Sequence, residues 1–229
     1  MQSRRSFALF ATAIVLFALA MSYLESAVVV YLDGALGAPV GDIFPLRPAF
    51  AGHQLVAIEV GREAATLVMI ALVGVIAGRA PLERLAWSAV VFGAWDIGYY
   101  AWLFVVAGWP PSLLTTDLLF LIPVPWVGPV WSPLVVSLAL VGFGLAAART
   151  IRQGHVVALR PWHVAAGVGG GALVILSWTL DFRRISDGGS PGDYAWPLFA
   201  VGMLAAVAAA VDALSARRTG RRPASAGTA

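Results

Sequence analysis

Six long apolar runs follow one another along this chain and leave little sequence for a water-soluble core. Each run is close to the ~20 residues that a helix needs to cross the hydrocarbon of a bilayer. We therefore expect an all-α fold, a polytopic membrane helix bundle of about six transmembrane helices, with the spans at about residues 7–31, 54–78, 85–108, 128–148, 163–180 and 195–214.

The composition also favours a bilayer as the solvent. Of the 229 residues, 60% are hydrophobic and 12% are charged, whereas about a quarter of an ordinary soluble domain is charged. The absence of lysine excludes a retinal Schiff base. The absence of cysteine excludes disulfides and thiolate metal sites. The net charge of +3 comes from arginines in loops and tail, so it reports membrane topology and does not indicate nucleic-acid binding.

The arginines predict the orientation. With the N-terminus in the cytoplasm, eleven arginines lie on the inner side of the six spans and three on the outer side, at Arg47, Arg183 and Arg184. This bias follows the positive-inside rule. We expect both termini in the cytoplasm and a bacterial-type plasma (inner) membrane as the location, with the lipid bilayer as the first partner.

The N-terminus allows a second interpretation. Residues 3–7, with Arg4 and Arg5, followed by an apolar stretch to Ala20 resemble a twin-arginine export signal. The apolar character resumes from Ser26 to Leu32, which is longer than a signal and favours a retained helix. We therefore expect one transmembrane domain over residues 1–216. Residues 217–229, rich in Arg, Ala, Ser and Gly, are expected to form a disordered cytoplasmic tail.

The segment between the third and fourth spans, residues 108–123, is too apolar for a solvated loop and is interrupted by prolines. A short re-entrant or interfacial element on the outer face fits this pattern, because irregular backbone at that depth must be buried in protein or line a cavity. Its helical part would be capped by Ser112, Thr115 or Thr116.

Ionisable residues interrupt the second and third spans, and these groups are expensive to place in hydrocarbon. At the ~1.5 Å rise of a helix, Glu59 and Glu63 lie about 8 and 14 Å below the outer end of their span. Asp96 lies about 12 Å below the outer edge of a ~30 Å core. We therefore expect a polar cavity in the outer half, open to the outer face, built by Glu25, Glu59, Arg62, Glu63, Asp96, Tyr99, Tyr100 and Asp117.

Helical spacing refines this expectation. Glu59 and Glu63 are four residues apart and share a face, while Arg62 can reach Glu59 or another helix. Asp96 shares a face with Tyr99 and Tyr100, either of which could donate a hydrogen bond to its carboxylate.

The expected cavity carries more negative than positive charge. Glu25, Glu59, Glu63 and Asp96 against Arg62 leave three carboxylates uncompensated, and Asp117 would add a fourth. Several bare carboxylates cannot persist together at low dielectric. Either some are protonated, or a cation, a cationic solute or water shares the site.

A divalent metal is a further candidate occupant. His53, Glu59, Glu63 and Asp96 together offer oxygen ligands and one imidazole, although the Glu-x-x-His spacing of di-metal bundles is absent. His155 and His163 lie on the opposite side, so a bis-histidine haem site is not favoured.

Three functions remain open. The first is a protein that binds or transports a proton, a cation or a cationic solute. In that case Glu59, Glu63 and Asp96 would be the titrating or ligating groups, Arg62 their electrostatic regulator and the proline-rich segment a lid. The second is an enzyme acting on a lipid-type substrate at the outer leaflet, with a carboxylate as general base. The third is a non-catalytic subunit or assembly factor whose charged layer pairs with a protein partner or another copy of the chain.

Overall fold

The computed structural model describes residues 2–36, 53–187, 189–216 and 218–219. Long helices dominate this part of the chain, and short strands connect or extend them. The long helices are α1 (Gln2–Leu36), α2 (His53–Ala77), α3 (Pro81–Ala107), α4 (Trp131–Arg152), α5 (Pro161–Thr179) and α7 (Trp196–Ser215). The short elements are α6 (Phe182–Ser186), β1 (Thr116–Phe120), β2 (Trp126–Pro129), β3 (His155–Val156) and β4 (Arg218–Thr219).

Within the described residues, six helices are long and apolar enough to cross a membrane. Their outward faces carry large apolar side chains, of which Ile76 is 83% exposed and Leu9 72% exposed. Surfaces of this kind are rare on soluble monomers and fit contact with lipid. The helices are therefore those of a multi-pass membrane protein, as the apolar runs predicted.

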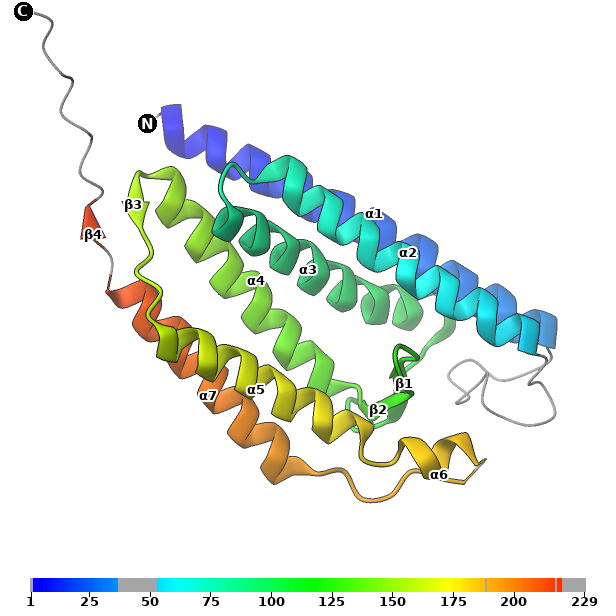
Figure 1. Ribbon diagram of the computed structural model, residues 1–229. Helices are drawn as coiled ribbons and strands as arrows, with labels where there is room; N and C mark the ends of the chain where they lie inside the picture. The colour runs from blue at the N-terminus through cyan, green and yellow to red at the C-terminus, as the bar shows by residue number, and fades with distance from the viewer. Residues whose placement is uncertain (1, 37–52, 188, 217, 220–229) are drawn as a thin grey trace, which may run out of the picture.

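The long helices form two groups. Helix α3 packs against α1, α2 and α4, whereas α5 pairs with α7. The two groups meet through fewer contacts, between α4 and α7 and between β2 and α5. Figure 1 shows that α1 begins and α7 ends at one end of the bundle, while β1 and β2 lie at the opposite end. Both ends of the helical region therefore face the same side, and their cytoplasmic location stays a prediction.

Close helix contacts depend on small residues. A Cβ on Gly144 would lie 2.7 Å from the carbonyl oxygen of Ala86, and one on Gly93 would lie 2.4 Å from that of Ser137. Both positions therefore bring α3 and α4 into backbone contact. Trp87 of α3, fully buried, lies in the main apolar core between these helices and α1.

At the end near the termini, polar groups join the helices. Buried Glu83 of α3 accepts a hydrogen bond from Nε of Arg152 at 2.6 Å, and the same guanidinium donates to the Ala77 carbonyl at 2.9 Å. His163 of α5 pairs with Asp212 of α7 at 2.8 Å. Because Nδ1 of His163 accepts from the Arg160 backbone N–H, its Nε2 carries the proton and donates to Asp212.

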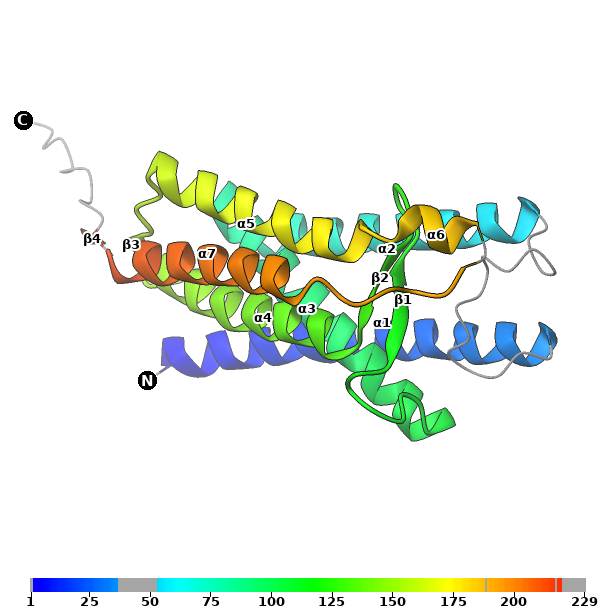
Figure 2. The same ribbon diagram turned by 90° about the horizontal axis from the view of Figure 1, so that it is seen from below.

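The segment between α3 and α4 corrects one expectation. Its helical part is not formed: Thr116–Phe120 is strand β1, paired antiparallel with β2. Ser112 caps a tight turn, accepting from the Leu114 N–H at 3.1 Å. Prolines at 123 and 125 lack the N–H that a helix would need, so they fall in the connection between the strands. Figure 2 shows this hairpin running across the bundle, and its re-entrant depth stays a prediction.

The expected tail is described at two residues. Arg218 and Thr219 form β4, which pairs with His155 and Val156 of β3. Residues 217 and 220–229 lie outside the described residues, as do Arg47 and the side chain of His53.

Candidate functional site

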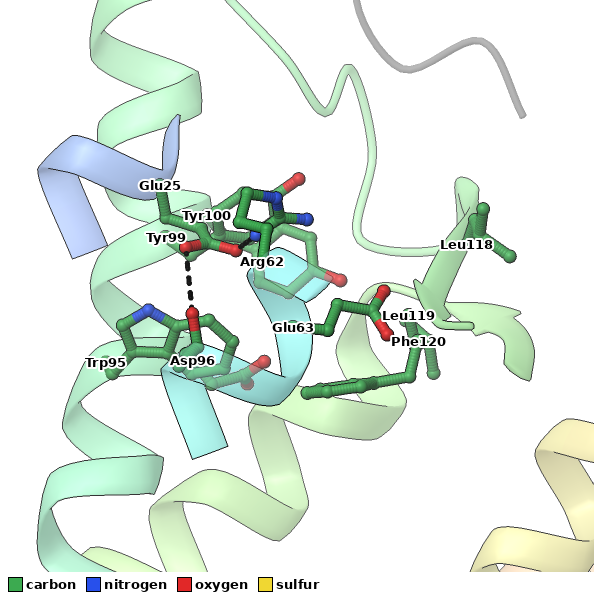
Figure 3. Close-up of a pocket in the computed structure, with 11 residues that line it drawn as sticks. Glu25, Arg62, Glu63, Trp95, Asp96, Tyr99, Tyr100, Leu118, Leu119 and Phe120 are labelled. Atoms are coloured by element: carbon green, nitrogen blue, oxygen red, sulfur yellow. Dashed lines mark hydrogen bonds and ion pairs between the residues drawn. The ribbon is translucent and has the colours of Figure 1, made fainter. Parts of the chain in front are cut away.

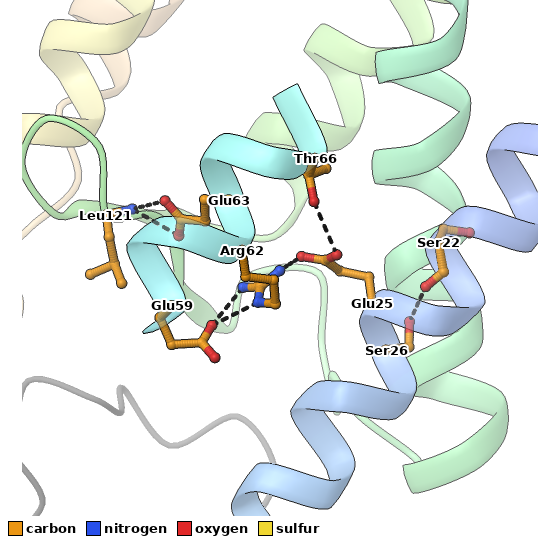
Figure 4. A network of polar contacts seen from close by, with 8 residues as sticks. All are labelled: Ser22, Glu25, Ser26, Glu59, Arg62, Glu63, Thr66 and Leu121. Carbon is orange, nitrogen blue, oxygen red and sulfur yellow. Dashed lines mark hydrogen bonds and ion pairs between the residues drawn. The ribbon is translucent and has the colours of Figure 1, made fainter. Parts of the chain in front are cut away.

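Arg62 of α2 holds two carboxylates. Its guanidinium contacts Oε2 of Glu59 through Nη2 at 2.7 Å and through Nε at 2.8 Å. It also forms an ion pair with Glu25 of α1. The Arg62 side chain is 23% exposed and each glutamate 12%, so the three charges are largely shielded from solvent. Figure 4 shows Arg62 between the two acids, which satisfies both alternatives that the helical spacing left open.

Hydroxyl groups complete the contact between α1 and its neighbours. Thr66 of α2 donates to Oε2 of Glu25 at 3.4 Å. Ser26 of α1, fully buried, donates to the Tyr99 carbonyl of α3 at 3.0 Å. Glu25 is therefore fixed from α2, while the helix that carries it is fixed to α3.

Glu63 connects α2 to the hairpin. Both of its carboxylate oxygens accept from the backbone N–H of Leu121, at 3.0 and 2.9 Å. The residue is 8% exposed, and Leu121 follows directly after β1. A peptide dipole stabilises a buried carboxylate but does not neutralise it, and among the described residues no arginine or histidine forms an ion pair with Glu63.

Asp96 and Asp117 are held by neutral donors. The hydroxyl of Ser137 on α4 donates to Asp96 at 2.8 Å. Asp117 of β1 accepts from the Tyr100 phenol at 2.8 Å and from the Leu118 N–H. Burial raises the pKa of Asp117 to about 7, and these two hydrogen bonds offset only part of the desolvation. The Tyr100 phenol, which was expected near Asp96, therefore donates to Asp117, because α3 turns Tyr100 toward the hairpin.

These groups surround a small cavity of about 50 Å³. A single water needs roughly 10–15 Å³ of such volume, so a compact polar group fits. Figure 3 shows the residues that line it, which come from α1, α2, α3 and β1. We call this cavity the polar chamber; it is lined by Glu25, Arg62, Glu63, Thr66, Trp95, Asp96, Tyr99, Tyr100, Leu118, Leu119 and Phe120.

Most of the expected site residues meet here. Of the eight, all but Glu59 and Asp117 line the polar chamber, and these two contact its lining through Arg62 and Tyr100 respectively. The expected site did not include Thr66, Trp95, Leu118–Phe120 or Ser137. A serine inside an apolar span was the available signal for Ser137, whereas the strand residues gave none.

Trp95 carries an unused donor. Its side chain is 6% exposed and lines the polar chamber, yet its buried Nε1–H has no hydrogen-bond partner within the described part of the chain. An unpaired buried donor of this kind is unfavourable. A water molecule that reaches Trp95 would accept this hydrogen bond.

The expected metal set is not assembled by the side chains that the structure describes. Among them, no cluster of three or more His, Asp or Glu residues is arranged to hold a metal ion. Glu59 pairs with Arg62, Glu63 with Leu121, and Asp96 with Ser137. The imidazole of His53 lies outside the described residues.

Comparison of the chain with protein-family models, with curated proteins and with solved structures finds no match.

Proposed function

We propose that this chain is an integral membrane protein that binds a compact cation, of the size of an ammonium group or a hydrated proton, in the polar chamber. The observation that carries the proposal is the distribution of charge around the chamber. Arg62 is already matched by Glu25 and Glu59. Glu63 and Asp96 line the same small space with neutral donors, so a cation arriving there meets unmatched negative charge.

The lining supports a cation of ammonium type. Trp95, Tyr99, Tyr100 and Phe120 contribute aromatic surface beside the carboxylates. Aromatic rings attract a desolvated ammonium through their quadrupoles. A volume of about 50 Å³ admits the charged group itself and excludes a bulky substituent, so the chamber selects for a small head.

The direct test uses methylammonium as the probe and the full chain reconstituted in vesicles of neutral phosphatidylcholine. Equilibrium binding should saturate, and Glu63→Gln and Asp96→Asn should each lower the affinity at least tenfold. A unit charge about 4 Å from a cation is worth about 4 kcal/mol at an effective dielectric constant near 20. Access of water reduces this, but tenfold needs only about 1.4 kcal/mol.

Asp193→Asn is the matched control, because Asp193 is an exposed acid in the connection before α7. Its affinity for methylammonium should equal that of the wild type. Unchanged binding in both chamber variants, or an equal loss in the control, would overturn the proposal. Methylammonium uptake into the same vesicles then separates a transporter from a binding protein. Each variant is first checked for helix content and monodispersity, so that loss of binding is not loss of fold.

A further inference from the structure

A second cavity adjoins the polar chamber and differs from it in size and polarity. It has a volume of about 690 Å³ and lies between α3, α4, α5 and α7. Small-molecule sites are typically about 300–1,000 Å³. Apart from Asp96 and a few other polar groups such as Ser137 and Ser88, its walls are apolar. Leu85 and Ile175, which line it, are also exposed, so the cavity reaches the lipid-facing surface.

The two cavities share a wall. Asp96, Leu119 and Phe120 line both of them. Figure 3 shows the Phe120 ring beside the Asp96 carboxylate, and the same ring packs against Trp95 and Trp126. A molecule lying in the apolar cavity would therefore present one end to Asp96 and to the polar chamber.

The apolar cavity is long enough for a hydrocarbon chain. Along α3 its lining runs from Leu82 to Asp96, which at a rise of ~1.5 Å per residue spans about 21 Å. An extended alkyl chain advances roughly 1.25 Å per carbon, because its ~1.5 Å bonds zigzag. The cavity therefore matches a chain of roughly 16 carbons that ends at Asp96.

Glycines on α5 keep this space open. A Cβ added to Gly167 or Gly171 would meet nothing within 4 Å, and both residues line the apolar cavity. Gly170 behaves differently, since its Cβ would lie 2.5 Å from the Gly202 carbonyl oxygen of α7. Close helix approach thus accounts for Gly170, while Gly167 and Gly171 leave room for an occupant.

We propose that the apolar cavity holds the single chain of an amphiphile whose head is a primary ammonium group bound at Asp96. This inference depends on the proposed function and names the ligand class. A phosphodiester head is disfavoured, because the polar chamber is about 50 Å³ and is lined by the carboxylates of Glu25, Glu63 and Asp96. A small cationic head is attracted by Glu63 and Asp96, while its chain fills the apolar space.

The experiment compares hexadecylamine with methylammonium on the full chain in neutral detergent. Radiolabelled hexadecylamine should bind at least a hundredfold more tightly than methylammonium. Gly167→Leu and Gly171→Leu should each lower hexadecylamine affinity at least tenfold and leave methylammonium unchanged. Gly169→Leu is the matched control, because a Cβ there also meets nothing within 4 Å and the residue lies outside the cavity lining. This comparison also cancels partitioning of the probe into micelles.

The outcomes separate the two proposals. Saturable methylammonium binding with no effect of either cavity-filling variant on hexadecylamine refutes this inference and leaves the proposed function standing. Failure of methylammonium to bind the wild type refutes the proposed function itself. If hexadecanol or palmitate displaces the labelled probe as effectively as unlabelled hexadecylamine does, the assignment of an ammonium head is refuted. The inference is supported if Asp96→Asn loses binding of both probes while Gly171→Leu loses binding of hexadecylamine alone.

Discussion

Replacement of Arg62 by methionine tests the charge arrangement on which the site depends. The substitution keeps an unbranched side chain of similar reach and removes the cation that holds Glu25 and Glu59. Two carboxylates, each 12% exposed, then lack their cationic partner. We expect a clear loss of folding stability, because the remaining charges must be protonated or solvated at a buried place.

The magnitude follows from the exposure of the three side chains. Breaking a fully buried ion pair by removing one partner costs about 3–5 kcal/mol, whereas an exposed pair is worth about 0–1 kcal/mol. Arg62, at 23% exposure, lies between these limits and nearer the buried one. We therefore expect Arg62→Met to lower the free energy of unfolding by about 2–3 kcal/mol.

The assay is unfolding by sodium dodecyl sulfate in mixed maltoside micelles, followed by far-ultraviolet circular dichroism. Arg183→Met provides the control, because Arg183 is exposed and its loss should change stability by less than about 0.5 kcal/mol. The triple variant Glu25→Gln, Glu59→Gln, Arg62→Met removes all three charges and should recover most of the loss. A stability of Arg62→Met within the control's range, or a triple variant weaker than the single one, would refute the reasoning.

Three further predictions concern other parts of the bundle. Burial raises the pKa of Asp117 from 3.8 to about 7, so the folded protein loses a stabilising proton as the pH rises toward 7. The melting temperature of the wild type should therefore fall between pH 5 and 8, and it should fall less in Asp117→Asn. Parallel plots of melting temperature against pH for the two proteins would contradict this. Glu83→Gln leaves the Arg152 guanidinium without its carboxylate and should lower unfolding free energy by about 2 kcal/mol in the same titration; no change would show that the pair contributes nothing. Gly170→Leu must push α5 away from Gly202 and should lower the melting temperature by several degrees, which an unchanged melting curve would exclude.

The spans, and the meeting of acids from separate spans, could be predicted from the sequence, whereas their depth in a bilayer stays a prediction. Helix rise is fixed at about 1.5 Å per residue, so Glu63 and Asp96 had to lie at comparable depths once their spans were placed. The structure brings both to one chamber together with Glu25. What the sequence left open was the rotation of α1 about its axis, and this rotation decides that Arg62 reaches Glu25 as well as Glu59.

The hairpin could not be predicted, because a short apolar run is compatible with a helix or a strand. Leu118–Phe120 therefore line the chamber without a sequence signal that predicts it.

The apolar cavity could not be predicted from the sequence for a related reason. Gly169 and Gly171 are indistinguishable in the sequence, although Gly171 lines the cavity and Gly169 does not. In a bilayer both lipid-facing and cavity-facing residues are apolar, so composition does not separate them.

The partners of the acids revise the role first assigned to Arg62. It was expected to regulate the titrating groups Glu59, Glu63 and Asp96, but its guanidinium is engaged by Glu59 and Glu25. Because Arg62 pairs with Glu59 and Glu25, Glu63 and Asp96 are the acids of the chamber that remain to bind a ligand.

Each of these two acids also holds a different element in place. Glu63 binds the hairpin through the Leu121 N–H, and Asp96 binds helix α4 through the Ser137 hydroxyl. A carboxylate offers about four lone-pair sites, so a cation can bind without displacing these donors. Binding should then tighten the hairpin and α4 against the chamber, because a neutralised pair is less unfavourable to bury than a bare charge. The variants Glu63→Gln and Asp96→Asn remove the charge and keep one acceptor oxygen for the same donor, which is why these substitutions separate ligand binding from the anchoring of the fold.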